Sequence, residues 1–205
     1  HIGGDECLAT DPADFAVFFE RTSRIARETG KTPIAWHEAG AVPSLAEGTI
    51  GQYWGSTRPQ GTHQEEASHF ATHGGGLIMS PSDAAYLDMK YDADYPLGLT
   101  WAGLVDLRTA YSWEPTEVVD GVPASAILGV EAPLWTETVR SLADVDRLVF
   151  PRVGAVAEIA WSAPAAACPE RTWESFRRRV AGLAAGWTSA GIAFHATDEI
   201  EWTAA

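Results

Sequence analysis

The chain has 205 residues, with 28 acidic against 14 basic side chains and a formal net charge of −14 at pH 7. A chain of this length buries a substantial core, and 46% hydrophobic with 20% charged residues excludes a disordered protein. The acidic balance argues against nucleic acid as a partner. No apolar run approaches the roughly 18 residues that cross a membrane, so we expect no membrane partner either.

Helical and strand-like segments alternate through the first half of the chain. Asp11 as the N-cap, Pro12 at the first helical position and Gly30 as the stop together predict an amphipathic helix. Short apolar runs predict strands, and the segments between and after them predict a helical turn and a helix. The strands are expected at 32–36, 49–54 and 77–79, the turn at 43–48 and the helix at 64–73.

The second half continues the alternation after a loop at 90–101 that is rich in Tyr, Asp and Pro. A helix is expected at 104–111, a strand at 126–134, and long helical patterns at 144–162 (interrupted by Pro151) and 172–190. Short buried strands that alternate with helices predict βα units and a parallel sheet. Because no linker or repeat divides the chain, it is one domain or part of one.

In such folds the chemistry gathers at the carboxyl ends of the strands. Each predicted strand end here carries an aromatic residue, an acid or both. Where the two are spaced i and i+2, an extended backbone would place them on one face. A Trp beside a carboxylate suits a sugar, because the ring packs on the pyranose and the carboxylate accepts hydrogen bonds from hydroxyls. The segments are Gly4-Asp5-Glu6, Trp36-His37-Glu38, Tyr53-Trp54, Tyr86-Leu87-Asp88 and Trp135-Thr136-Glu137.

The nine tryptophans divide by position. Those at strand ends, close to polar residues, are interpreted as walls of a ligand pocket: Trp36, Trp54 and Trp135. Those on helical patterns are expected to pack in the core: Trp161, Trp173 and Trp187.

The adjacent acids Asp5 and Glu6 follow Gly3-Gly4, which gives the backbone room to turn and lets a ligand approach closely. Taken alone, this string also fits a plain turn or a helix cap. In its context, His1-Ile2-Gly3-Gly4-Asp5-Glu6 resembles the catalytic motif of family 20 glycoside hydrolases, the β-N-acetylhexosaminidases. The similarity continues in order over nearly the whole chain: Trp36 with Glu38, Trp54, Tyr86-Leu87-Asp88, Trp101, Trp135-Thr136-Glu137, Phe150-Pro151-Arg152 and Ala157-Glu158.

The resemblance implies an α/β fold, a (β/α)8 TIM barrel. In the family the acidic motif lies at the end of the fourth strand. We therefore expect residues 1–205 to supply about the second half of a catalytic barrel domain, from the end of strand 4 through helix 8 and a C-terminal tail. The remainder of the same barrel would then be a partner, and an upstream arginine that grips sugar hydroxyls in the family has no counterpart here.

The resemblance also implies an exo-acting, retaining hydrolysis that releases terminal β-linked N-acetylglucosamine or N-acetylgalactosamine, with neither metal nor cofactor. The substrate's own acetamido oxygen attacks C1 and forms an oxazolinium ion, an exception to the two-carboxylate scheme. The implied substrates are N-acetylhexosamine glycans or chitooligosaccharides, as in chitin degradation. The implied catalytic residues are Asp5, Glu6 and Tyr86, and the implied substrate-binding residues are Trp36, Trp54, Asp88, Trp101, Trp135 and Glu137.

Other interpretations stay open at this point. A non-catalytic glycan-binding protein would use the same tryptophans. Diguanylate cyclases share the Gly-Gly-Asp-Glu string but continue with Phe, where Cys7 stands here, and the helical spacing of His69 and His73 could hold zinc, although no His-Glu-x-x-His string is present. Whether Cys7 and Cys168 form a disulfide is undecided. Acidity and glycan chemistry favour a secreted or extracytoplasmic location.

Overall fold

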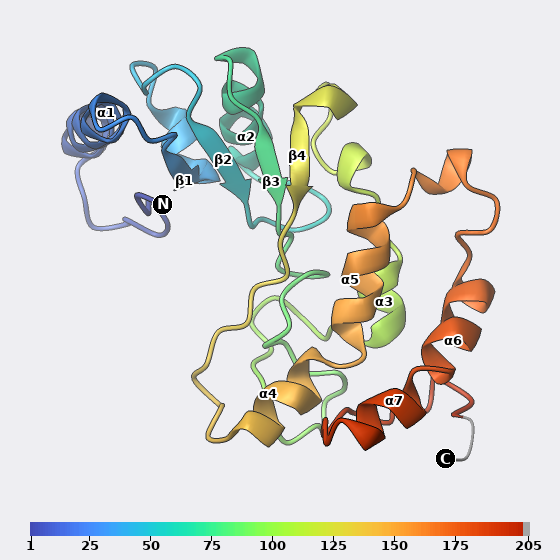
Figure 1. Ribbon diagram of the computed structural model, residues 1–205. Helices are drawn as coiled ribbons and strands as arrows, with labels where there is room; N and C mark the ends of the chain where they lie inside the picture. The colour runs from blue at the N-terminus through green and yellow to red at the C-terminus, as the bar shows by residue number, and fades with distance from the viewer. Residues whose placement is uncertain (203–205) are drawn as a thin grey trace. The chain divides into compact units, whose positions relative to one another are not determined.

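The computed structural model describes residues 1–202, which divide into two compact units. Unit 1 comprises His1–Pro81 and Thr116–Gly129, and unit 2 comprises Ser82–Pro115 and the chain from Val130 onward. Figure 1 shows the helices and strands of both units. The helices within residues 1–202 are all too short or too polar to span a bilayer.

Unit 1 is organised around a sheet whose strands follow one another in chain order (Figure 1). Ile34 lies opposite Ile50 and Gln52 opposite Ile78, and both of these strand pairs are parallel, as predicted. The sheet consists of β1 (Ile34–Trp36), β2 (Ile50–Tyr53), β3 (Leu77–Met79) and β4 (Ile127–Val130). The last strand is shorter than the predicted 126–134 and stops before Trp135.

The first residues of the chain lie alongside β1. The backbone N–H of Ile2 donates to the carbonyl of Ile34 over 2.8 Å, and the N–H of Trp36 donates to the carbonyl of Gly3 over 3.0 Å. Gly4 has a φ of +117°, which favours glycine, and an added Cβ would lie 3.2 Å from the Phe19 ring. The two backbone hydrogen bonds with β1 bring the motif that begins at Gly3 to the carboxyl end of this strand.

Two helices of unit 1 confirm the sequence prediction. In α1 (Pro12–Glu28) the side chain of Asp11 accepts the N–H of Ala13 as the N-cap. The second helix, α2 (His63–Thr72), packs closely on the 3-10 helix η1 (His37–Ala41). At Gly40 an added Cβ would lie only 1.9 Å from the carbonyl oxygen of Glu66, so the contact requires glycine. The helical turn predicted at 43–48 is wrong, because the turn forms earlier, as η1, directly after β1.

Helices dominate unit 2. Residues 172–190 form two helices instead of the single predicted one, because α6 ends at the C-cap Gly182. The elements are α3 (Leu107–Tyr111), α4 (Leu142–Val149), α5 (Arg152–Trp161), α6 (Trp173–Ala181) and α7 (Ala184–Ser189). Short 3-10 helices are η2 (Pro115–Glu117), η3 (Ala124–Ala126) and η4 (Ala165–Ala167); η3 lies in unit 1, and η2 crosses the boundary between the units in the chain.

The helix tryptophans do not all pack as predicted. Trp161, at the end of α5, is 91% exposed, so the prediction that it packs in the core is wrong. Trp173 and Trp187 are half-buried and contact other rings: Trp173 lies 5.9 Å from Phe176 and Trp187 lies 5.4 Å from Phe150, between centroids. The helical period of apolar residues predicts which face of a helix is buried, but it does not predict burial for a residue at the helix end.

The core of unit 2 contains a fully buried arginine. Arg152 donates hydrogen bonds to backbone carbonyls of Leu87, Met89, Val105 and Leu148, and its guanidinium lies 3.8 Å from the Tyr91 ring centre. Burial raises the pKa of Tyr91 to about 12, so the phenol stays neutral. Since Leu87 and Met89 flank Asp88, the arginine fixes the backbone on both sides of a predicted substrate-binding residue.

Candidate active site

In unit 1 the predicted acid Glu6 lies in a strained turn after the strand-like first residues. Its φ is +49°, and it is the one residue other than glycine with a positive φ in the described part of the chain. Such backbone is uncommon for a non-glycine residue and persists where the surroundings hold it. Its side chain is exposed, as is that of Asp5. The turn therefore presents both carboxyl groups beyond the carboxyl end of β1, where the sequence places them.

A cavity of about 440 Å³ opens beside Glu6 within unit 1. Glu38 and Trp54 line it from the ends of β1 and β2, and Leu8 and Phe15 give it an apolar side. His63 also lines the cavity. Two of the predicted site residues, Glu6 and Trp54, thus share one cavity.

Glu38 links these two residues. Its Oε1 accepts the backbone N–H of Glu6 over 3.4 Å, and the indole Nε1–H of Trp54 donates to Oε1 over 3.1 Å and to Oε2 over 2.9 Å. Burial raises the pKa of Glu38, while hydrogen bonds to its own backbone, to Trp54 and to the backbone of Glu6 oppose the rise. The carboxyl group therefore ties the end of β2 to the turn of Glu6.

His37 lies behind Glu38 and is fully buried. Its Nδ1 is 3.4 Å from Oε2 of Glu38, and its ring meets the His63 ring edge-on at 4.7 Å between centroids. Burial lowers the pKa of His37 to about 3, with a smaller contribution from His63. The ring is consequently neutral at physiological pH, and its contact with Glu38 is not an ion pair.

Asp5 and Trp36 are not among the described residues that line the cavity. The Trp36 ring instead contacts the His1 ring, with centroids 4.8 Å apart. Within unit 1 the structure therefore groups Glu6 with Trp54 and Glu38, and places Asp5 and Trp36 at neighbouring strand ends.

Unit 2 gathers another group of predicted residues around Tyr86. The Tyr86 ring meets the Trp101 ring edge-on at 5.8 Å between centroids and lies 6.4 Å from the Trp135 ring. Tyr86 is buried, whereas Trp101 and Trp135 are 54% and 43% exposed. Two exposed indoles beside a buried phenol form an aromatic surface of the kind that packs against a sugar ring.

Asp88 is a buried carboxyl group in the same region of unit 2. Burial, with a smaller contribution from the charge of the exposed Glu137, raises its pKa to about 6. The backbone N–H of Trp135 and the Arg152 guanidinium oppose this rise. Asp88, Trp135 and Glu137 thus interact electrostatically within unit 2.

The expected sharing of one extended face is wrong for all three acid–aromatic pairs with this spacing. Glu38 lies in η1, after β1 has ended at Trp36, and Asp88 and Glu137 each lie in a turn. Tyr86 follows the end of β3 by a turn at 82–85. Strand ends bend where the backbone leaves the sheet, so the two-residue period does not extend beyond the last paired residue.

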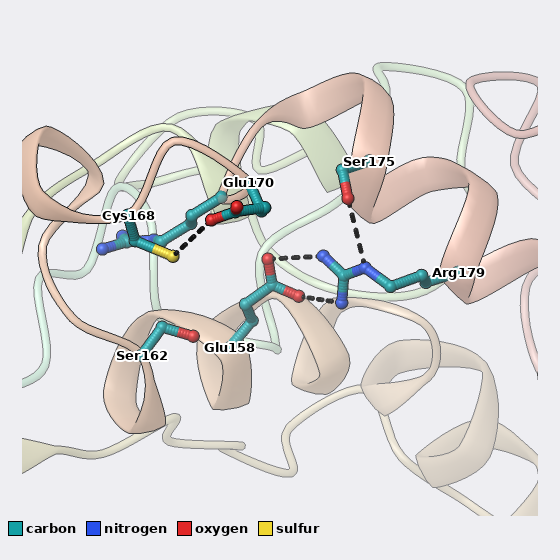
Figure 2. A pocket seen from close by; sticks show the side chains of 7 residues that line it. Glu158, Ser162, Cys168, Glu170, Ser175 and Arg179 are labelled. Atoms are coloured by element: carbon teal, nitrogen blue, oxygen red, sulfur yellow. Dashed lines mark hydrogen bonds and ion pairs between the residues drawn. The ribbon is translucent and has the colours of Figure 1, made fainter.

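A second pocket, of about 220 Å³, lies in unit 2 (Figure 2) and contains none of the predicted site residues among its described lining. Arg179 donates to both carboxylate oxygens of Glu158, and Tyr111 donates to the same carboxylate over 2.9 Å. The buried Arg171 pairs with Glu114 at 2.8 Å. Because these charges already satisfy one another, the pocket is held by a structural ion-pair network, and Glu158 belongs to it.

The alternatives from the sequence gain no support here. Within residues 1–202, no three or more His, Cys, Asp or Glu side chains are arranged to hold a metal ion. The rings of His69 and His73 stack face to face at 3.7 Å. Both cysteines carry free thiols, so Cys7 and Cys168 do not form a disulfide in this structure.

Sequence reasoning missed three contributors. No specific role is predicted from the sequence for Glu38, His37 or Arg152, although all three stand in segments that the sequence singles out. The run Trp36-His37-Glu38 directly after a strand is the signal for the first two. Nothing in the sequence marks Arg152 as buried, because arginine is almost never fully buried without partners, and its carbonyl partners are distant in the chain.

The parallel sheet that alternates with helices, with acids and aromatic residues at its strand ends, places the chain in the α/β class. Residues 9–164 match the family model described as the catalytic domain of glycosyl hydrolase family 20. The chain belongs to glycosyl hydrolase family 20.

Individual relatives agree with this assignment. A β-N-acetylhexosaminidase of Cellulomonas fimi is 41% identical over 202 residues, which are 98% of this chain and 39% of the relative. A solved family 20 β-N-acetylglucosaminidase superposes with a TM-score of 0.93 at 50% identity, over 98% of this chain and 43% of that one. A mutant Streptomyces plicatus β-hexosaminidase, solved with its product GlcNAc, gives a TM-score of 0.92 at 42% identity, over 99% of this chain and 40% of that one.

The fold is therefore that of part of the family's TIM-barrel catalytic domain, as predicted. The chain spans about two fifths of the length of these relatives.

Proposed function

We propose that this chain belongs to an exo-acting, retaining β-N-acetylhexosaminidase that releases terminal β-linked N-acetylhexosamine from glycans, including chitooligosaccharides. The single observation that carries the proposal is the turn that presents Asp5 and Glu6 at a strand end, with Glu6 beside Glu38 and Trp54 in one cavity. Relatives named as β-N-acetylhexosaminidase and N,N'-diacetylchitobiase support the substrate class. We further propose a secreted or extracytoplasmic location, in keeping with the acidic net charge.

In the proposed first step, the carbonyl oxygen of the substrate's 2-acetamido group attacks C1. The bond from C1 to the leaving oxygen breaks, and Glu6 transfers a proton to that oxygen as the general acid. Asp5 orients the acetamido group and stabilises the positive charge that develops on its nitrogen, as electrostatic stabilisation requires. Tyr86 donates a hydrogen bond to the acetamido oxygen.

In the proposed second step, Glu6 acts as a base. It takes a proton from water, whose oxygen attacks C1 from the side that the leaving group vacated, and the oxazolinium ring opens to restore the acetamido group. Two inversions at C1 give retention. Because the nucleophile comes from the substrate, Asp5 has no need to reach C1, and its adjacency to Glu6 is compatible with the chemistry.

The sugar-binding roles are those that the family resemblance implies. We propose that Trp36, Trp54 and Trp135 wall the acetamido pocket and support the ring, and that Trp101 lies beside the site, toward the leaving group. Asp88 and Glu137 would accept hydrogen bonds from ring hydroxyls, since a carboxylate is a strong acceptor.

The test is Glu6→Gln in the full-length protein, with Glu65→Gln as the matched control on the exposed face of α2. With 4-nitrophenyl β-N-acetylglucosaminide, loss of a general acid should lower kcat/KM by about 10²–10⁴-fold. The control should leave it unchanged. Nearly intact activity in Glu6→Gln would show that the acid is misassigned. Binding of N-acetylglucosamine by a wild-type protein without turnover would support the glycan-binding alternative instead.

A further inference from the structure

The strained turn of Glu6 has one side-chain acceptor on its backbone N–H, the carboxyl group of Glu38, which lies 32 residues further along the chain. The contact is 3.4 Å long and joins the first residues of unit 1 to η1. A residue other than glycine held at a φ of +49° needs support from its surroundings. Glu38 supplies part of this support to the backbone of Glu6, the proposed acid.

The same carboxyl group also fixes Trp54. Both of its oxygens accept the indole N–H, at 3.1 and 2.9 Å, which sets the rotation of a ring that lines the cavity. Charge-assisted hydrogen bonds of this kind are shorter and stronger than neutral ones. One side chain thus controls the orientation of a proposed sugar wall and the backbone of a proposed acid.

Glu38 is itself held in place. Its side chain is 22% exposed, and the fully buried His37 lies 3.4 Å away through Nδ1. His37 in turn contacts His63 edge-on. A carboxyl group with little freedom can hold its partners within the tolerance that catalysis needs, because small misplacements of a catalytic group are costly.

We propose that Glu38 is a positioning residue that holds Glu6 and Trp54 in one arrangement, so that proton transfer to the leaving group depends on it. The inference rests on the proposed function, since it concerns the acid step of that reaction. Glu38 itself touches neither the leaving oxygen nor C1 in this account.

The experiment compares two aryl β-N-acetylglucosaminides in the full-length protein. The 4-nitrophenyl leaving group benefits from protonation, whereas the more acidic 2,4-dinitrophenyl group leaves with little help. Glu38→Gln keeps the side-chain size but replaces one acceptor oxygen with an amide that cannot accept an N–H. We expect kcat for the 4-nitrophenyl substrate to fall about 10–100-fold and kcat for the dinitrophenyl substrate to fall far less.

Two variants separate this effect from a general loss of structure. Glu65→Gln, an exposed acid on α2, should change neither rate. Trp54→Phe removes the indole N–H and leaves the Glu38–Glu6 contact, so it should raise KM without changing the ratio of the two kcat values. If Glu38→Gln behaves like Trp54→Phe, with a raised KM and an unchanged ratio of the two kcat values, Glu38 positions only the tryptophan and the inference is overturned.

Glu38→Asp provides a second route if the glutamine variant does not fold. Shortening the side chain by one methylene withdraws the carboxylate from the Glu6 N–H, so the rate ratio should move in the same direction. An unchanged ratio overturns the inference while the proposed function stands. If the wild-type protein hydrolyses neither substrate, the proposed function fails and the inference falls with it.

Discussion

Replacing Arg152 by methionine should destabilise unit 2 strongly. The variant removes every donor that the guanidinium supplies to the carbonyls of Leu87, Met89, Val105 and Leu148. A buried acceptor that loses its donor costs about 1–3 kcal/mol. The Leu148 carbonyl keeps the Tyr91 hydroxyl as a donor, so the other three carbonyls together cost at least about 3 kcal/mol before the surroundings relax. Methionine recovers part of this, because the desolvation of a buried guanidinium is also removed.

We therefore expect a net loss of at least about 2 kcal/mol in the free energy of unfolding. The assay is urea denaturation of the full-length protein. The urea concentration at the midpoint is compared between variants, with an unchanged dependence of the free energy of unfolding on urea. Arg140→Met is the matched control, since Arg140 is exposed, and should stay within about 0.5 kcal/mol of wild type. A similar midpoint for the two variants would refute the view that Arg152 holds this part of the chain.

Three further outcomes follow from the structure. Gly40→Ala should lower the unfolding midpoint by the equivalent of about 1–3 kcal/mol, because its Cβ would lie 1.9 Å from the Glu66 carbonyl oxygen; an unchanged midpoint contradicts the packing. His37 has a pKa near 3 when folded, so below its ordinary value of about 6.5 the unfolded chain alone binds a proton, and stability falls by up to about 1.4 kcal/mol per pH unit. His37→Gln should show a flatter decline between pH 6.5 and 5 in thermal unfolding, and an identical decline would reject the assignment. Asp88 should lose its charge as the pH falls through about 6, so kcat/KM should drop there, and Glu137→Gln should shift this acid limb to lower pH; an unmoved limb shows that Glu137 does not act on Asp88.

The order of elements was accessible from the sequence because local signals mark them. Asp11-Pro12 begins α1 where the capping preferences place it, and short apolar runs identify β1, β2 and β3. The break between α6 and α7 was not predicted, because the apolar period continues through Gly182. Periodicity reports which face is apolar and does not report where the backbone turns.

The sequence predicts the candidate site residues, and the structure brings only some of them together. Glu6 lies at a strand end with Trp54 near it, and Tyr86 lies beside Trp101 and Trp135. The link through Glu38 could not be derived, because it depends on a 3-10 helix and on a positive φ at Glu6. Both arise from contacts between distant segments, which a single sequence does not reveal.

The most direct test of the central claim compares 4-nitrophenyl β-N-acetylglucosaminide with 4-nitrophenyl β-glucoside as substrates of the full-length protein. The two differ only in the group at C2, so the comparison isolates the proposed nucleophile. Substrate-assisted catalysis predicts turnover of the N-acetylglucosaminide and no detectable turnover of the glucoside. Equal rates on the two substrates would contradict it.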